Sequence, residues 1–102
     1  MKIFFTRQSN ARLENIYQFY LPKNELAATD IYNQILEQIE FLKKQPYMAA
    51  LEPLLAGRVY PYRGLVILRL FKVIYYVEND VIIVADIWDC RQDIAKHTEN
   101  LP

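Results

Sequence analysis

Side chains that could act on a phosphodiester gather in the second half of the chain. They are cations, phenols and an imidazole, namely Arg63, Arg69, Lys72, Arg91, Tyr60, Tyr62 and His97. Metal-free RNA cleavage needs cations around the scissile phosphate, a base for the 2′-hydroxyl and an acid for the leaving oxygen. Aromatic rings can stack on exposed bases. These residue types are therefore compatible with a metal-free ribonuclease site.

A structural interpretation of the same residues stays open. Arginine and lysine at the rim of a sheet commonly lie in solvent or pair with nearby acids, here Asp86 and Asp89. Tyr60 and Tyr62 can cover a core, and His97 lies in a polar stretch. Residue types alone favour this structural interpretation over catalysis.

Most other catalytic templates are excluded by composition. The only glycines are Gly57 and Gly64, so a glycine-rich phosphate loop is absent. One histidine, one cysteine and no clustered carboxylates predict neither a metal site nor a cofactor. Ser9 and Cys90 are poor candidates for a nucleophile paired with His97, because lone Cys and His residues are mostly structural.

Size and composition predict an ordinary globular protein. With 102 residues, 53% hydrophobic and 24% charged, the chain is expected to form one domain over residues 1–102. No apolar stretch is long enough for a membrane span and the first residues lack a signal-peptide layout, so we expect a cytoplasmic protein. A single cysteine fits that reducing compartment.

The formal net charge is zero, which gives no case for tight, non-specific attachment to nucleic acid. The distribution is uneven, however. Between Pro53 and Val77 there is no acidic residue, and the cations of that segment are Arg58, Arg63, Arg69 and Lys72. A neutral protein can therefore carry one locally positive face.

The elements that would position these residues follow from periodicity and caps. Residues 2–5 read as a short strand, and Thr6 as the cap of a helix that stops at Leu21-Pro22. Asn24 is expected to cap a second helix reaching down to Gln45-Pro46. Apolar, β-branched runs at residues 65–77 and 81–88 indicate strands.

A two-residue turn at Asn79-Asp80 fixes the expected register of the last hairpin. In that register Tyr76 lies opposite Ile83, Ile74 opposite Ala85, and Lys72 opposite Ile87. Lys72, Asp89 and Arg91 then share one face, with Arg69, Phe71, Asp86 and Trp88 on the other; a bulge would reverse part of this grouping. The order strand, helix, helix, strands predicts an α+β fold, a small antiparallel sheet with a helical hairpin packed on one face.

The chain resembles the RelE/ParE family of toxins from bacterial type II toxin–antitoxin modules. The resemblance is carried by the order of elements, the Ala-rich opening of the second helix, the strand Phe71–Val77 (FKVIYYV) and the ending Ile87–Asp93 (IWDCRQD). It covers essentially the whole chain. It implies a small cytoplasmic toxin neutralised by a cognate antitoxin, whose C-terminal segment wraps across the helices and the sheet.

The family resembled here divides in function. RelE-like members cleave mRNA on the ribosome without a metal, and ParE-like members inhibit DNA gyrase without being nucleases. By resemblance to the nuclease branch, Arg63 and Lys72 would hold phosphate, Arg91 would stabilise developing charge and His97 would be a general acid. Lys72 stands where that branch usually has arginine, so a bidentate contact is lost.

Ribosome-dependent mRNA cleavage is the leading expectation from the sequence. Contacts to nucleic acid are then expected from Arg58, Tyr60, Tyr62 and Arg69. The alternatives are gyrase inhibition, which the neutral charge favours because nuclease members are commonly basic, and an inactive binding module. The expected partners are therefore an antitoxin and either the ribosome with mRNA or gyrase, with no membrane and no small-molecule substrate.

Overall fold

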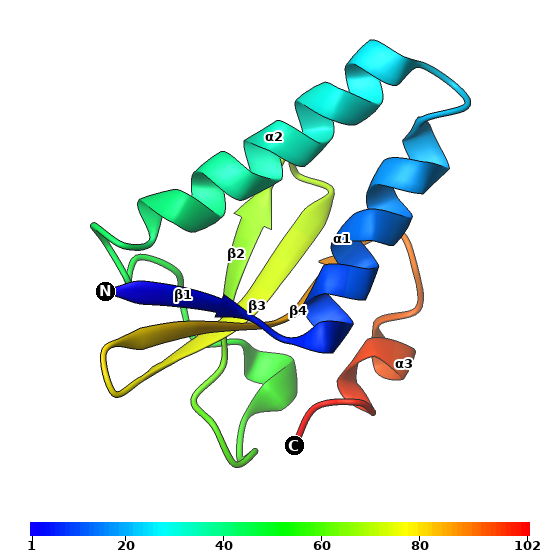
Figure 1. Cartoon of the computed structure of the whole chain (residues 1–102). Coiled ribbons are helices and arrows are strands. Elements are labelled where there is room, and N and C mark those ends of the chain that lie inside the picture. Colours follow the sequence, from blue (N-terminus) through cyan, green and yellow to red (C-terminus); the bar gives the residue numbers. More distant parts are fainter.

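The structure is a computed structural model that describes residues 1–93 and 95–102. Its strands are β1 (Lys2–Phe5), β2 (Arg63–Ile67), β3 (Phe71–Glu78) and β4 (Val81–Asp89). Its helices are α1 (Arg7–Tyr20), α2 (Glu25–Phe41), α3 (Ile94–Thr98) and the 3₁₀ turn η1 (Pro53–Leu55). The predicted α+β class and the helical hairpin are confirmed (Figure 1). Within the described residues, no helix has both the length and the apolar character needed to cross a membrane.

Both long helices begin where the sequence predicts. The Thr6 hydroxyl accepts a hydrogen bond from the Ser9 amide at 3.2 Å, and the Asn24 side chain accepts one from the Ala27 amide at 3.1 Å. Each cap satisfies a backbone donor that the first helical turn leaves free. The second helix ends at Phe41, a few residues before the predicted limit.

The sheet is mixed, so the expected all-antiparallel arrangement is wrong at one edge. Its strand order is β1-β4-β3-β2, and β1 runs parallel to β4 from Lys2 opposite Val81 to Phe5 opposite Val84. A parallel neighbour requires a long crossover, and here the crossover contains both long helices and the β2–β3 pair. This arrangement packs the inward side chains of β1, Ile3 and Phe5, against the core beneath the helical hairpin, where they are partly buried.

The apolar run at residues 65–77 is two strands joined by a tight turn. Leu68 and Arg69 both adopt φ of 56°, in the left-handed region, and Ile67 pairs with Phe71 across the turn. There is no glycine or proline at this turn, so the apolar pattern of residues 65–77 suggests one continuous strand. The next turn lies at Asn79 and Asp80 as predicted, with φ of 52° and 62°.

A register shift between Ile74 and Tyr75 divides the β3–β4 hairpin into two halves. Near the turn the predicted pairing holds, with Tyr76 opposite Ile83. Beyond the shift, Ile74 lies opposite Asp86 and Lys72 opposite Trp88, so the predicted partners Ala85 and Ile87 are wrong. The extra residue of a bulge moves every later side chain of β4 to the other face.

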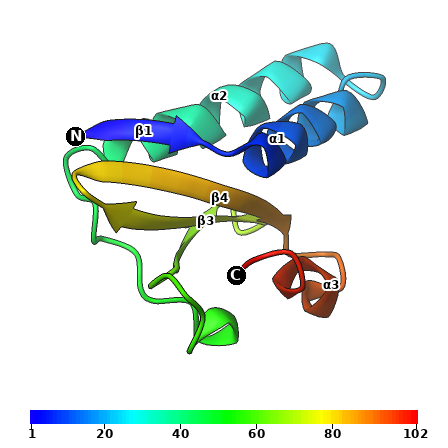
Figure 2. The same cartoon turned by 60° about the horizontal axis from the view of Figure 1, so that its bottom comes forward.

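Both faces of the sheet are covered (Figure 2). The helical hairpin covers one face, over a core that includes Leu13, Ile35, Ile39, Leu42, Phe71, Val73, Tyr75, Ile82, Val84 and Ile87. The opposite face, which we call the Trp88 face, carries a second cluster made by Leu55, Tyr62, Ile74, Ala85, Trp88 and Leu101. Residues from the segments 53–62 and 95–102 therefore pack on the side of the sheet that the hairpin leaves open.

Candidate functional site

Lys72 lies on the Trp88 face, away from Asp89. Residues directly opposite each other in an antiparallel pair place their side chains on the same face, so Lys72 accompanies Trp88. The expected grouping of Lys72 with Asp89 and Arg91 is therefore wrong. Its physical cause is the bulge, which shifts β4 by one residue.

The Lys72 ammonium is bound by an acid that the sequence argument did not consider. Its Nζ lies 3.0 Å from each carboxylate oxygen of Glu52, whose side chain is only 3% exposed. The same Nζ lies 6.0 Å from the centre of the Trp88 ring. A β-carbon on Gly64 would come within 2.7 Å of the Lys72 side chain, so glycine leaves room for the lysine.

Arg63 and Arg58 are also bound by protein acceptors. Arg63 donates from Nη1 to the Ala49 carbonyl at 2.7 Å, and its guanidinium lies 5.0 Å from the centre of the Tyr47 ring. Arg58 donates from Nη1 to the carbonyls of Thr98 and Leu101, at 2.8 and 2.5 Å. Both arginines thus hold loop backbone in place.

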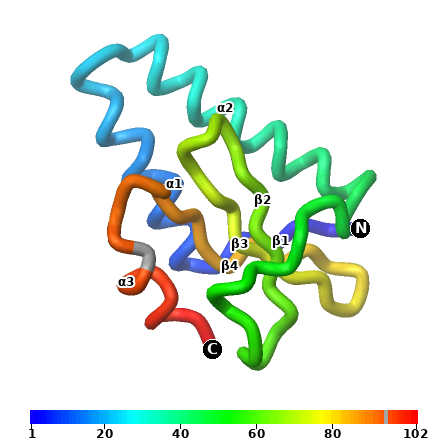
Figure 3. The backbone as a smooth tube through the Cα atoms, turned by 180° about the vertical axis from the view of Figure 1, so that it is seen from behind, coloured from blue at the N-terminus to red at the C-terminus, as the bar shows by residue number. Residues whose placement is uncertain are grey.

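Arg58 ties the end of the chain to the loop that contains it. Beside its two bonds, the Val59 amide donates to the Pro102 carbonyl at 2.8 Å. Seen from behind, residues near the C-terminus lie against the loop around residues 53–62 (Figure 3). We call residues 95–102 the C-terminal strap, because they cross the Trp88 face and bury Leu101 there.

Arg91 lies at the end of β4, on the side of α1. Its guanidinium donates to both carboxylate oxygens of Asp89, at 3.0 and 2.8 Å, and to the Tyr20 hydroxyl at 2.9 Å. The hydrogen bond from Arg91 lowers the pKa of Asp89, against the opposing effect of burial. With a side chain 49% exposed, Arg91 keeps part of its surface in solvent.

His97 is buried within the C-terminal strap. Its ring stacks on Trp88 with centroids 5.8 Å apart and planes 12° apart. The residue is 4% exposed, and its Nε2 has no hydrogen-bond partner among the described residues. A buried imidazole in this setting packs chiefly as an aromatic ring.

One cavity brings Arg91 and His97 together. It measures about 400 Å³ and lies between α1, the end of β4 and the strap. Its apolar floor includes Ile16, Phe71 and Ile87, and its polar lining is Arg12, Asn15, Asp89, Arg91, Gln92 and His97. Arg63 and Lys72 lie outside this lining, so the cavity brings together only two of the four predicted catalytic residues.

The predicted base-stacking tyrosines pack on each other. Tyr60 stacks on Tyr76 with centroids 4.1 Å apart, and Tyr62 meets both rings edge-on. Burial, together with the neighbouring Tyr60, raises the pKa of Tyr76 to about 12. The remaining predicted contact, Arg69, is exposed in the β2–β3 turn.

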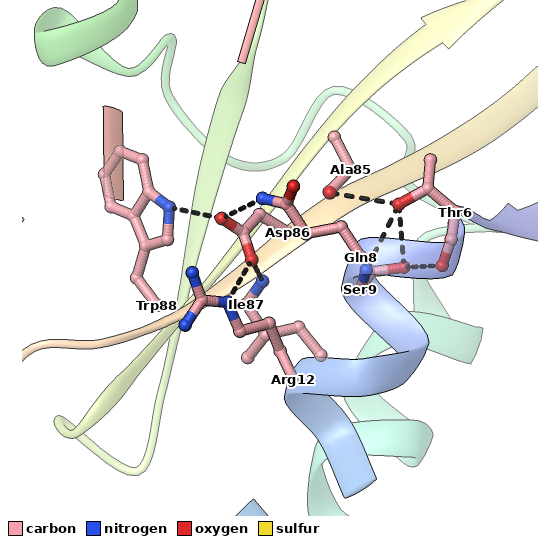
Figure 4. A network of polar contacts seen from close by, with 8 residues as sticks. All are labelled: Thr6, Gln8, Ser9, Arg12, Ala85, Asp86, Ile87 and Trp88. Atoms are coloured by element: carbon pink, nitrogen blue, oxygen red, sulfur yellow. Dashed lines mark hydrogen bonds and ion pairs between the residues drawn. The ribbon is translucent and has the colours of Figure 1, made fainter. Parts of the chain in front are cut away.

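The fully buried Asp86 shares a face with Trp88 as predicted, but its partners on α1 were not predicted (Figure 4). It accepts hydrogen bonds from Gln8 at 2.8 Å, from the Ile87 amide at 2.8 Å and from the Trp88 indole at 3.1 Å. Arg12 forms an ion pair with it at 3.3 Å. The sequence contains one sign of this network, because Asp86 stands inside an apolar strand. A buried carboxylate is costly unless it is paired or hydrogen-bonded, so partners for it were to be expected.

The comparisons with known proteins agree with this geometry. The family described as "ParE toxin of type II toxin-antitoxin system, parDE" matches residues 3–94. A solved chain from the "Chromosomal ParDE TA system from P. aeruginosa" is similar, with a TM-score of 0.72 and 25% identity, over 87% of this chain and 95% of that one. A search of the curated proteins found no match. Because the family match spans most of the sequence, the chain belongs to the ParE toxins of type II toxin–antitoxin systems, a family that implies a cognate antitoxin as partner.

Proposed function

We propose that this toxin inhibits growth by binding a protein target, DNA gyrase, and does not cleave RNA. The observation that carries the proposal is that three of the cations predicted to contact RNA are already bound by acceptors within the protein. Lys72 is held by Glu52, Arg63 by the Ala49 carbonyl, and Arg58 by carbonyls of the strap. A nuclease of the expected kind needs such cations free to meet a phosphate.

Charge and surface support the same proposal. The formal net charge is zero, whereas attachment to RNA draws on many uncompensated cations. Residues 53–62 and the strap cover the Trp88 face around Ile74, Ala85 and Trp88, so a base would have to displace them to stack there. The similar P. aeruginosa chain comes from a ParDE system. Gyrase inhibition is the activity that the resemblance to ParE-like members implies.

The rival proposal is ribosome-dependent mRNA cleavage. It is favoured by the shared cavity of Arg91 and His97, in which Arg91 would stabilise negative charge and His97 would act as general acid. His97 would first have to leave its stack on Trp88, because its residue is 4% exposed. Both targets belong to the cytoplasm, where either proposal places the protein.

Two assays on the purified toxin separate the proposals. We expect loss of DNA supercoiling by gyrase in proportion to added toxin, and intact mRNA on programmed ribosomes. Toxin preincubated with its antitoxin is the control for both assays. Shortened transcripts with unaffected supercoiling would favour the rival, and normal growth on expression without any antitoxin would indicate an inactive binding module.

A further inference from the structure

Glu52 is the nearly buried acid of the Trp88 face, and its position is fixed by backbone contacts. Its amide donates to the Tyr62 carbonyl at 2.8 Å, and its own carbonyl accepts from the Leu55 amide at 3.1 Å. Two residues earlier, the Ala50 carbonyl accepts from the Gly64 amide at 3.1 Å. The carboxylate is therefore presented to the sheet by a segment that is bonded to β2 and to the residues just before it.

The partner of this carboxylate is the ammonium of Lys72. Both Glu52 oxygens lie 3.0 Å from Nζ, while the lysine side chain is 23% exposed and the glutamate side chain 3%. The lysine side chain is therefore partly exposed at the surface, whereas the glutamate carboxylate that neutralises it is buried. An ion from solvent that captured Lys72 would leave the Glu52 carboxylate buried and uncompensated, which is strongly unfavourable.

Gly64 keeps the pair in this geometry. Its position beside Lys72 is so close that a β-carbon would meet Cδ at 2.7 Å, Cγ at 3.1 Å and the Glu52 Oε2 at 3.2 Å. The lysine side chain therefore passes close over Gly64 of β2 and ends at the glutamate. The pair is consequently part of the packed structure, unlike an exposed ion pair that opens freely in water.

We propose that Glu52 is a specificity-determining residue, an internal counter-ion that denies Lys72 to the phosphates of single-stranded RNA. It deepens the proposed function and rests on it, since a toxin directed at a protein must not be drawn to cellular RNA. With Glu52 neutral, the β2 edge of the Trp88 face presents an uncompensated lysine directly opposite the exposed Val66. One added phosphate contact is then available.

The test is the affinity of Glu52→Gln for a fluorescent oligouridylate of about 12 nucleotides, a length within one protein's usual footprint. We expect the Kd to fall about fivefold or more at about 50 mM salt, relative to the wild-type chain. We also expect the plot of log affinity against log salt to steepen by about 0.7, the value for one further phosphate on a single strand.

Two variants control for charge and for the lysine. Glu37→Gln removes the same charge from an exposed position on α2, and it should leave the affinity near that of the wild-type chain. The double variant Glu52→Gln/Lys72→Met should bind the oligouridylate no more tightly than the wild-type chain, because the lysine that would contact the added phosphate is gone. Equal affinities and equal salt slopes for Glu52→Gln and Glu37→Gln would overturn the proposal, as would wild-type binding as tight as that of Glu52→Gln.

These outcomes differ from those that bear on the proposed function. Intact gyrase activity or cleaved mRNA with the wild-type toxin would refute gyrase inhibition, whatever the oligouridylate affinities are. Should Glu52→Gln lack a cooperative unfolding transition, acetylation of the wild-type toxin gives a second test. Lys72 should react at least about tenfold more slowly than the exposed Lys44, and equal rates would overturn the internal pairing.

Discussion

The indole Nε1 of Trp88 donates a hydrogen bond to Asp86 Oδ2 over 3.1 Å, two residues back along the same strand. The carboxylate is fully buried, and Arg12 and Gln8 reach it from α1. This contact joins the buried hydrogen-bond network of Asp86 to Trp88, the one tryptophan of the sequence. Trp88 is linked through Asp86 to α1 and stacks on His97 of the C-terminal strap. Its fluorescence emission therefore reports on the packing of α1 and of the strap.

Asp86→Ala tests how much this network contributes. The change leaves Arg12, Gln8 and the Trp88 indole without their acceptor, so we expect a loss of about 3–5 kcal/mol in unfolding free energy. Urea unfolding followed by Trp88 fluorescence measures it. Glu37→Ala, on the exposed side of α2, should change the value by no more than about 0.5 kcal/mol. A comparable loss in both variants would contradict the role given to Asp86.

Gly64→Ala tests the close approach of Lys72. The added methyl would meet the lysine at 2.7 Å, and we expect a cost of about 1–3 kcal/mol from overpacking. In a Lys72→Ala background the same substitution should cost far less, because the crowded atoms are gone. A double-mutant cycle in urea should give a coupling of about 0.5–3 kcal/mol. A cycle that closes with no coupling would show that Gly64 serves some other purpose.

Arg58→Ala tests the attachment of the C-terminal strap. The substitution removes bonds to the Thr98 and Leu101 carbonyls, and hydrogen bonds to charged groups contribute about 1.5–3 kcal/mol each. We expect faster amide hydrogen exchange at Val59, which is bonded to Pro102, and a red shift of Trp88 emission. Arg7→Ala, at the exposed start of α1, is the matched control and should leave both signals unchanged.

The pair of Asp89 and Arg91 predicts a pH dependence with a definite sign. Arg91 lowers the pKa of Asp89 in the folded protein, so the ionised carboxylate is favoured more in the folded than in the unfolded state. Its contribution to stability is present above the unfolded pKa of about 3.9 and is lost as the pH falls through the lower folded value. The stability difference between the wild-type chain and Arg91→Ala should therefore be constant near neutrality.

Below about pH 4 that difference should shrink. Urea unfolding of both proteins across this range is the measurement, and Arg7→Ala again supplies the comparison because it should show no such narrowing. If the difference in unfolding free energy between the wild-type chain and Arg91→Ala stays constant down to about pH 2, Arg91 acts through Tyr20 and packing rather than through the Asp89 charge.

Local patterns were enough to predict the two long helices, their caps and the Asn79-Asp80 turn, whereas the short helix α3 and the 3₁₀ turn η1 were not predicted. Each of these depends on residues close in sequence, such as Thr6 with Ser9 or Asn24 with Ala27. The turn at Leu68 and Arg69 escaped because both residues adopt left-handed φ without the residue types that usually signal it. Tertiary packing determines that turn.

The candidate site was harder to predict because one bulge decides it. Charge patterns alone pair cations with the nearest acids in sequence, which favoured Asp86 and Asp89 as partners of the last hairpin. For Arg91 that rule succeeds with Asp89, whereas Lys72 pairs with Glu52, twenty residues away in the irregular segment. The register shift between Ile74 and Tyr75, which no residue type marks, moves Asp89 to the face opposite Lys72, and Lys72 instead contacts Glu52.

The placement of β1 beside β4 has a consequence for synthesis of the protein. The opening residues find their strand partners only at Val81 to Val84, and Arg12 finds Asp86. A chain still emerging from the ribosome cannot complete these long-range contacts until the final hairpin has left the tunnel. Prematurely terminated products would leave β1 with no neighbour, and cells would be expected to degrade such fragments before they could do harm.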